Sequence, residues 1–218
     1  MRLRSLARSI YERSIGLKPR CDLPYATHLP VLSLAMAVFR PARIIEFGTG
    51  GYSTHAFVDG AVFPWVERVV AYENNREWFD ITAGTLSAHP IFSVHFVDGP
   101  IKLAATRQNL ADADLIFLDD SALGAERAQT IRAVAAVCGT RPLVVIHDYE
   151  VMPIRAACRA FEHRVGVKAW NPQCCLAWNG DAPRLQRVQA LARLLERECG
   201  GGAVTHLAHW AGLAELLG

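Results

Sequence analysis

Short runs of apolar, largely β-branched residues recur along the chain and are separated by longer mixed stretches. Five runs are apolar almost throughout: RIIEF (43–47), RVVAYE (68–73), FSVHFV (92–97), DLIFLD (114–119) and PLVVIHD (142–148). Runs without apolar–polar alternation are typical of strands that are covered on both faces, as in a parallel sheet. The stretches between them are long enough to form helices, so the pattern predicts a doubly wound α/β fold.

The pattern changes after the fifth predicted strand. A helical stretch, VMPIRAACRAFEH, is followed by the apolar runs RVGVKAW and CCLAWNG, which are separated only by NPQ. A parallel crossover needs a dozen or more residues, so this short connection predicts an antiparallel pair. The sheet should therefore carry an antiparallel strand near one edge.

We predict one compact domain with three segments. Residues 1–40 form an N-terminal helical segment, in which a helix over residues 26–40 is ended by Pro41; residues 41–180 form the sheet core; and residues 181–218 form a C-terminal helical extension. The basic N-terminal helix either packs on the domain with a solvated face or contacts an anionic membrane or a partner. With the C-terminal helix it could form a lid or a homodimer contact.

Composition narrows the class of protein. The 218 residues are 51% hydrophobic and 20% charged, with a net charge of +2, which argues against disorder and against a nucleic-acid partner bound through bulk charge. Six cysteines occur without a C-x-x-C pair, so we expect reduced thiols in a cytoplasmic protein. The N-terminus lacks the apolar core of a signal peptide, and no run of about 18 apolar residues predicts a membrane span.

The first predicted strand ends in an acid and a glycine-dense turn, EFGTGGYST. Glycines let the backbone turn tightly and approach a ligand, and Ser53 or the threonine after it can cap the next helix. A dinucleotide fingerprint would place a third glycine where Ser53 stands. Glu46, two residues before Gly48, would repel a pyrophosphate, so the turn suits a ligand with an amino group instead.

Acids also end the second and third predicted strands. Glu73 follows Gly48 by 25 positions, where a carboxylate can accept both hydroxyls of a ribose. Asp98 ends the third strand, where the exocyclic amine of a base could donate to it. Together with Glu46, these acids predict a pocket for a nucleoside with a cationic, amino-acid-like tail and no phosphates.

The segments IIEFGTGGYST, AYENNREWF, DLIFLDDS and VVIHDY resemble the successive motifs of class I S-adenosylmethionine-dependent methyltransferases. The nearest similarity is to small-molecule O-methyltransferases of the catechol and macrolide-sugar types, and it spans about residues 41–180. The resemblance implies a Rossmann-like seven-stranded sheet of order 3-2-1-4-5-7-6 with strand 7 antiparallel. It also implies S-adenosylmethionine as cofactor and a small-molecule acceptor, with a hydroxyl oxygen as the expected methyl acceptor.

The resemblance implies roles for individual residues. Glu46 would meet the methionine amino group, and Glu73 would take the ribose hydroxyls. The remaining positions of the implied cofactor site are Gly48, Thr49, Gly50, Gly51, Ser53, Asn74, Asp98, Gly99 and Asp119. For Glu46 and Glu73 the structural alternative is a helix-cap or salt-bridge role, and for Asp98 it is a simple Asp-Gly turn.

Candidates for the chemistry stand at the ends of the fourth and fifth predicted strands: Asp119, Asp120, His147, Asp148 and Tyr149. Our first hypothesis is His147 as a general base without a metal, since its pKa is near neutrality. Our second is a divalent metal site of Asp119, His147 and Asp148, in which the histidine would favour Mn, Fe or Zn over Mg. The third is a structural histidine held by neighbouring backbone.

Two further histidines, His28 before the sheet and His55 after the glycine turn, could line the pocket, although a place on the helix surface is simpler for His55. Three classes of function therefore remain at this point. The first is methyl transfer to a small molecule. The second is aminopropyl transfer or nicotinamide-dependent redox chemistry on a similar sheet. The third is a degenerate methyltransferase fold that binds a nucleoside or a partner chain.

Overall fold

The computed structural model describes residues 28–121, 123–167 and 172–199. The predicted basic N-terminal helix and the helix predicted over residues 206–218 lie outside these ranges. The strands are β1 (Arg43–Phe47), β2 (Arg68–Glu73), β3 (Phe92–Phe96), β4 (Leu115–Leu118), β5 (Leu143–His147), β6 (His163–Val167) and β7 (Cys174–Trp178). The helices are α2 (Leu29–Phe39), α3 (Ser53–Val58), α4 (Arg76–Leu86), η2 (Ile101–Ala104), α5 (Arg107–Leu110), α6 (Gly124–Val137), α7 (Met152–Ala157), η3 (Cys158–Ala160) and α8 (Ala182–Cys199).

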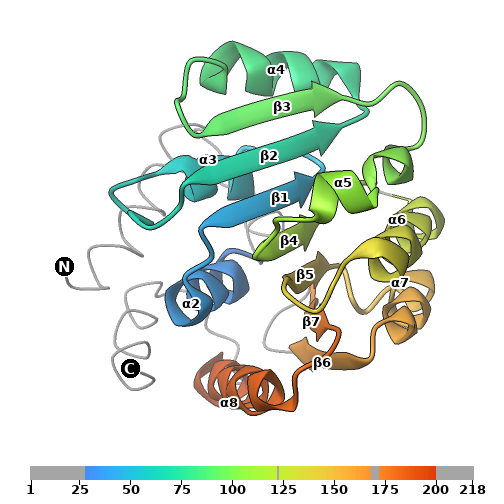
Figure 1. The fold of residues 1–218 in the computed structure, drawn as a ribbon. Coiled ribbons are helices and arrows are strands. Elements are labelled where there is room, and N and C mark those ends of the chain that lie inside the picture. The colour runs from blue at the N-terminus through green and yellow to red at the C-terminus, as the bar shows by residue number, and fades with distance from the viewer. Residues whose placement is uncertain (1–27, 122, 168–171, 200–218) are drawn as a thin grey trace.

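The seven strands form one sheet of order β3-β2-β1-β4-β5-β7-β6 (Figure 1). β1 to β5 run parallel to one another, and β7 is antiparallel to both β5 and β6. The predicted fold class, strand order and antiparallel strand 7 are therefore confirmed. β4 and β5 lie in the middle of the sheet and all of their residues are buried, which explains their unbroken apolar runs.

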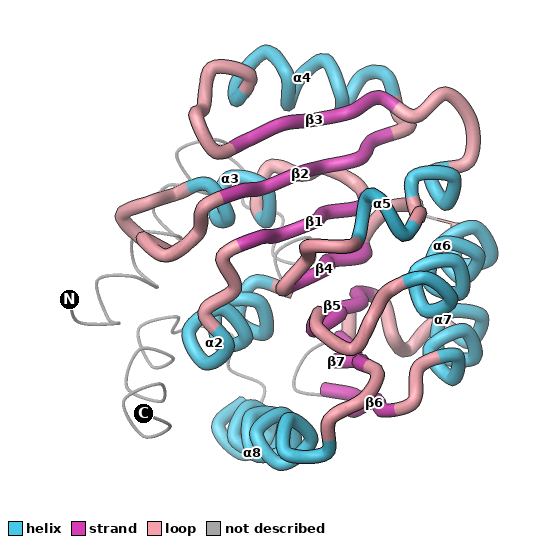
Figure 2. The backbone as a smooth tube through the Cα atoms, viewed as in Figure 1, coloured by secondary structure: helices cyan, strands magenta, loops and turns pink. Residues whose placement is uncertain are grey.

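Two apolar cores cover the two faces of the sheet. One face packs against α2, α3, the end of α4, and α8, and the other packs against η2, α5, α6 and α7. The layers are visible in Figure 2, where helices lie on both sides of the strands. Because β1 to β5 run parallel, their carboxyl ends meet at one edge of the sheet, which is where ligands bind in folds of this kind.

The helix predicted over residues 26–40 is α2. Pro30 lies in its first turn, and Arg40 closes it in the left-handed region, with φ 43°, directly before Pro41. Residue His28 is the N-cap of α2 and is only 3% exposed. The start of α2 is therefore packed into the protein near the carboxyl ends of the strands.

No helix among the described residues combines the length and apolar character needed to cross a bilayer. Four cysteines of the described residues carry free, buried thiols: Cys138, Cys158, Cys174 and Cys175.

Candidate active site

Gly48 follows β1 in a conformation that glycine adopts readily, with φ +85°. Its amide donates to the carbonyl of Tyr72, at 2.9 Å. A Cβ at this position would lie 2.4 Å from the backbone oxygen of Asp119 and 2.6 Å from the Cα of Asp120. The turn after β1 therefore lies directly against the end of β4, and only glycine permits that approach.

Glu46 is fully buried behind this turn. Its carboxylate oxygens accept hydrogen bonds from Ser53 Oγ (2.5 Å) and Thr54 Oγ1 (2.7 Å), and Thr54 Oγ1 accepts from the amide of Gly50 (3.0 Å). The N-cap of α3 is Tyr52, without a side-chain cap, so the prediction that Ser53 or Thr54 caps this helix was wrong. Their hydroxyls instead tie the glycine turn to the acid at the end of β1.

Burial raises the pKa of Glu46 from its usual 4.5 to about 8, although the two hydroxyl donors act to lower it. The folded protein thus holds this proton more tightly than the unfolded chain does. The contribution of Glu46 to the free energy of unfolding is fully present below pH 4.5 and is lost as the pH rises through about 8.

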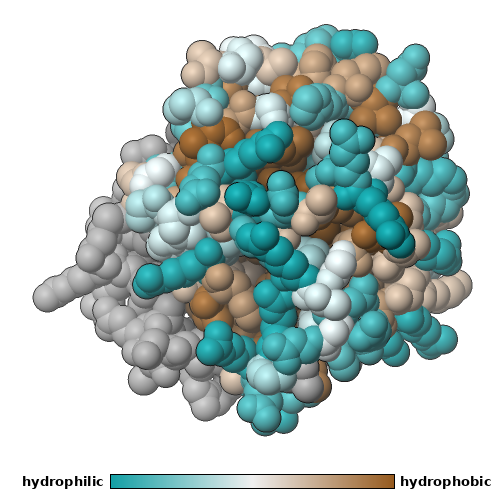
Figure 3. Space-filling view, in the orientation of Figure 1, coloured by the Kyte–Doolittle hydropathy of each residue, from teal (hydrophilic) through white to brown (hydrophobic). Residues whose placement is uncertain are grey.

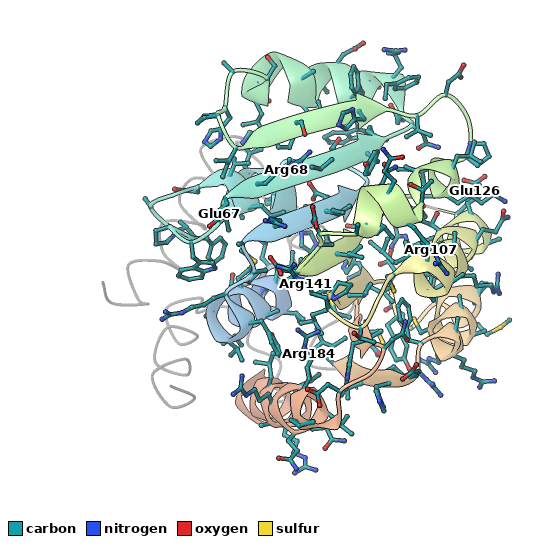
Figure 4. The ribbon with its side chains drawn as sticks, viewed as in Figure 1. Glu67, Arg68, Arg107, Glu126, Arg141 and Arg184 are labelled. Atoms are coloured by element: carbon teal, nitrogen blue, oxygen red, sulfur yellow. The ribbon has the colours of Figure 1, made fainter. Side chains whose placement is uncertain are left out.

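We expect Glu46→Gln to remove this dependence. Urea unfolding of both proteins from pH 5 to pH 9 measures the difference, and the slope for the wild type should exceed that of the variant by at most about 1.4 kcal/mol per pH unit. Glu67→Gln is the control, because Glu67 is an exposed acid directly before β2 (Figure 4), and it should leave the slope unchanged. Parallel pH curves for wild type and Glu46→Gln would contradict the raised pKa.

Glu73 ends β2 and is 4% exposed. One carboxylate oxygen accepts from the amide (2.7 Å) and the hydroxyl (3.0 Å) of Thr49, and the other accepts from the amide of Asn75 (2.7 Å). Thr82 of α4 donates to the Thr49 hydroxyl at 3.1 Å. The chain itself therefore uses both lone pairs of one Glu73 oxygen and one of the other, Oε1, which retains a lone pair for a further donor.

Two residues that follow β2 and β3, Asn74 and Asp98, line two different cavities. A cavity of about 260 Å³ lies at the carboxyl ends of the strands, and its lining includes Asn74, Ile101, Asp120 and Thr130. The Asn74 side chain spans to the next strand end, where it donates to the carbonyl of Gly99 at 3.2 Å. This cavity adjoins the turn after β1 and has the size of part of a cofactor, since whole-ligand pockets have about 300–1,000 Å³.

Asp98 is exposed and does not line this cavity. It borders a larger hollow of about 580 Å³ between β1–β3 and α5, which also contacts Arg68. Hydrophilic residues lie across this face in Figure 3 with apolar residues visible between them, and Arg68 is labelled on it in Figure 4. Asp98 therefore borders a different hollow from Asn74 and Asp120.

A charged cluster joins the ends of β4 and β5. His147 Nδ1 lies 3.2 Å from Asp119 Oδ1 and 3.6 Å from Asp148 Oδ1. His28 Nδ1 lies 4.0 Å from the other oxygen of Asp119, and the His28 and His147 rings meet edge to face at 5.0 Å. Arg127 of α6 contacts Asp119 at 2.9 Å and Asp148 at 2.5 Å.

The environment separates the charge states of the two histidines. Burial, with the charge of His147, lowers the pKa of His28 to about 3, so His28 is neutral. Burial also acts to lower the pKa of His147, but the hydrogen bond to Asp119 and the charges of Asp119 and Asp148 outweigh it, and the pKa is raised above its usual value. Burial alone would raise the pKa of Asp119, yet His147 and Arg127 hold it well below its usual range.

Asp120 lies at the edge of this cluster, with Oδ1 3.8 Å from Arg127 Nε. Asp120 accepts from Thr130 at 2.7 Å, as expected if only one residue of the Asp119–Asp120 pair faces His147. His55 lies in α3 and is half-buried, with its pKa lowered by burial. Arg127 was not predicted, because nothing in the sequence of α6 distinguishes it from the other charged residues of that helix.

The family resemblance raises the question of a divalent metal. The donor atoms of His28, Asp119 and His147 all lie within 4.8 Å of one another. The predicted set of Asp119, His147 and Asp148 instead surrounds the guanidinium of Arg127, which contacts both carboxylates. A divalent ion there would compete with a cation for the same oxygens, so these residues do not fit a metal as they are arranged.

No protein-family model matches the sequence, and no curated sequence matches it significantly. Solved structures do match the fold. The S-adenosylhomocysteine-bound methyltransferase PaMTH1 of Podospora anserina has a TM-score of 0.57 at 11% identity, over 79% of this chain and 88% of that one. The O-methyltransferase TomG of Streptomyces achromogenes, in complex with S-adenosylmethionine, has a TM-score of 0.53 at 17% identity, over 82% and 90%.

A third match is the spermidine synthase of Thermotoga maritima, with a TM-score of 0.50 at 13% identity over 74% of this chain. The chain spans 61% of that enzyme and 57% of an O-methyltransferase family protein from Burkholderia thailandensis that also matches. The chain has the class I S-adenosylmethionine-dependent methyltransferase fold. Identities of 11–17% establish this fold and leave the acceptor undetermined.

Proposed function

We propose that this protein transfers the methyl group of S-adenosylmethionine to a hydroxyl oxygen of a small molecule. The contact between Gly48 and the backbone of Asp119 carries the proposal. It places the glycine turn, which would hold the cofactor, against Asp119, which pairs with His147. A ligand bound against the glycine turn would thus lie beside a histidine–carboxylate pair.

The residues on the cofactor side fit the ligand that the fold class uses. The buried acids at the ends of β1 and β2, Glu46 and Glu73, suit an ammonium group and ribose hydroxyls. An ammonium group beside Glu46 would favour its ionised form, against the burial that raises its pKa. The cavity beside Asn74 is lined by polar residues together with Pro100 and Ile101, so it offers a base both hydrogen-bonding groups and apolar contact. PaMTH1 and TomG, which share the fold, are the matched structures solved with S-adenosylhomocysteine and S-adenosylmethionine.

The residues on the acceptor side fit proton removal from a hydroxyl. With Nδ1 of His147 donating to Asp119, the Nε2 atom is the basic nitrogen and takes the hydroxyl proton. When bound, the cofactor would supply the methyl group on a sulfonium, which would keep the electron pair of the C–S bond as the acceptor oxygen takes the methyl carbon. Asp119 stabilises the imidazolium that results.

His28 completes the acceptor side. Both of its ring nitrogens are buried and lack a hydrogen-bond partner, and its ring lies against that of His147. A buried polar group without a partner is costly, so these nitrogens suit a group of the acceptor. Because His28 stays neutral, it can donate to or accept from that group without a charge change.

A second function, nucleoside binding without turnover, is favoured by one observation. Both carboxylate oxygens of Glu73 already accept from the chain's own Thr49 and Asn75. A degenerate site, in which the chain's own groups occupy the cofactor's hydrogen-bond partners, would show such contacts. Cofactor binding without methyl transfer to any hydroxyl acceptor would support nucleoside binding over methyl transfer.

Calorimetric titration with S-adenosylmethionine and S-adenosylhomocysteine tests the proposal. We expect binding that Glu73→Gln weakens about 10- to 100-fold, since a hydrogen bond to a charged group contributes about 1.5–3 kcal/mol. Glu67→Gln is the matched control, because Glu67 is exposed and precedes the opposite end of β2. Thermal unfolding of both variants separates a lost contact from a lost fold. Equal affinity of wild type and Glu73→Gln, or no binding at millimolar ligand, would refute the assigned cofactor site.

A further inference from the structure

A single buried arginine connects the carboxylates at the ends of β4 and β5. Arg127 is 3% exposed, and its Nη2 lies 2.9 Å from Asp119 Oδ1 while its Nη1 donates to Asp148 Oδ2 at 2.5 Å. Its Nε faces Asp120 Oδ1 at 3.8 Å, and Nη2 also donates to the carbonyl of Ser121 at 2.7 Å. One guanidinium thus stands among three carboxylates that follow two adjacent strands.

We propose that Arg127 is the built-in cation of this site, so that the protein works without a divalent metal and Arg127 positions Asp119 for His147. The proposal rests on the proposed function for the role of His147. The family resemblance allowed a metal ion at Asp119, His147 and Asp148. In this proposal the positive charge beside the two carboxylates comes from Arg127 of α6 instead.

The geometry shows why a metal and this arginine exclude each other. A divalent ion bridging Asp119 and Asp148 would have to share both carboxylates with Arg127, which already contacts one oxygen of each. It would also lie within a few ångströms of the guanidinium, where repulsion between like charges in a buried site is strong. A planar guanidinium with donors on two sides instead satisfies both carboxylates at once.

Arg127 also determines the conformation of its partners. Asp148 follows β5 in the left-handed region, with φ 57°, which is unusual for a residue other than glycine. Its ion pair with Arg127 holds it there. Asp119 is held by the same guanidinium, with the oxygen that Arg127 contacts also facing His147 Nδ1. Arg127 is therefore a positioning residue that acts on His147 through Asp119.

The second group of possible ligands, His28, Asp119 and His147, is not a preformed site either. His28 Nδ1 lies 4.0 Å from Asp119 Oδ2, whereas ligands of one zinc ion at about 2.0–2.1 Å lie about 3.4 Å from one another. Asp119 would again have to share an ion with Arg127, which lies 2.9 Å away.

Metal titration of the cofactor-free protein tests the proposal, because it needs neither cofactor nor acceptor. Mn²⁺ binding is followed by electron paramagnetic resonance and Zn²⁺ binding by calorimetry. We expect no stoichiometric binding of either ion to the wild type. Arg127→Gln leaves three carboxylates without their cation and should bind Mn²⁺ about tenfold or more tighter than the wild type. Arg132→Gln, at an exposed arginine of the same helix, should not.

A second readout follows the ring protons of His147 by NMR. His147 faces Asp119, Asp148, His28 and Arg127, and of these the charge of Arg127 acts to lower its pKa. Arg127→Gln should therefore raise the pKa of His147, and Arg132→Gln should leave it unchanged. A double variant with Asp148→Asn, which tolerates the left-handed backbone, should lose the Mn²⁺ affinity that Arg127→Gln gains.

Stoichiometric Mn²⁺ or Zn²⁺ binding by the wild type would overturn the proposal, even if Arg127→Gln fails to fold. So would a folded Arg127→Gln protein with neither Mn²⁺ binding nor a shifted His147 pKa. These outcomes are separate from those of the cofactor titration. A wild type that binds S-adenosylmethionine and also binds Mn²⁺ refutes only the role of Arg127. A wild type that binds neither ligand refutes only the proposed function.

Discussion

Replacing His147 by alanine is expected to lower kcat by about 10²- to 10⁴-fold, the range that a positioned general base contributes. The affinity for S-adenosylmethionine should stay within about twofold, since the binding residues of β1 and β2 are untouched. A hydroxyl acceptor is first found by following transfer of a labelled methyl group to a panel of small alcohols and phenols. The drop in kcat is then measured on that acceptor.

The pH profile sharpens this prediction. His147 must be deprotonated to act as a base, so kcat should rise with pH through its raised pKa. Asp119→Asn removes the largest of the interactions that raise this pKa, so the rising limb should move to lower pH and the maximum rate should fall. His28 is neutral across this range, so it produces no limb of its own.

His95→Ala is the control for His147→Ala, because His95 is exposed on β3 and borders the larger hollow. It should leave both kcat and the pH limb unchanged. A His147→Ala enzyme that retains the wild-type kcat on the same acceptor would refute the role of His147 as base. In that case proximity to the cofactor alone would account for the transfer.

Gly48→Ala is expected to destabilise the protein by about 3 kcal/mol or more, and to abolish cofactor binding in whatever fraction stays folded. The residue has φ +85°, and the added methyl group would lie 2.4 Å from the backbone oxygen of Asp119. Because backbone atoms obstruct it, β1 and β4 would have to move apart to make room. Urea unfolding measures the change in the free energy of unfolding.

Gly84→Ala is the matched control and should act in the opposite direction. Gly84 lies in α4, is exposed, and has open space where a Cβ would stand. Alanine there should stabilise the protein by about 0.5–1 kcal/mol, because it restricts the unfolded chain and favours helix. If Gly48→Ala cost less than about 1 kcal/mol, the close approach of the turn to β4 would not hold in solution.

The parallel strands and the antiparallel pair could be predicted because they depend on local patterns, whereas the strand order was implied by the resemblance to class I methyltransferases. The unbroken apolar runs at 115–118 and 143–147 require cover on both faces, and helices between strands supply it. A connection as short as the one between β6 and β7 permits only an antiparallel pair. Acids directly after parallel strands meet at one edge, so Glu46 and Glu73 could be assigned to one site.

Four features of the site depended on contacts between distant positions. Arg127 meets Asp148 from 21 residues away, and the direction of its side chain follows from how α6 packs on the sheet. His28 reaches Asp119 only because α2 begins at the carboxyl ends of the strands.

The other two concern the surroundings of Glu46 and Asp98. Ser53 and Thr54 turn to Glu46 instead of capping α3, and Asp98 faces a different hollow from Asn74. The sequence alone determined the fold and the edge of the sheet where chemistry is to be sought, since periodicity and connection length are properties of the chain. Only the tertiary structure decided which charges meet there. A buried ion pair depends on how helices and strands pack, and the positions of those elements along the chain do not specify their packing.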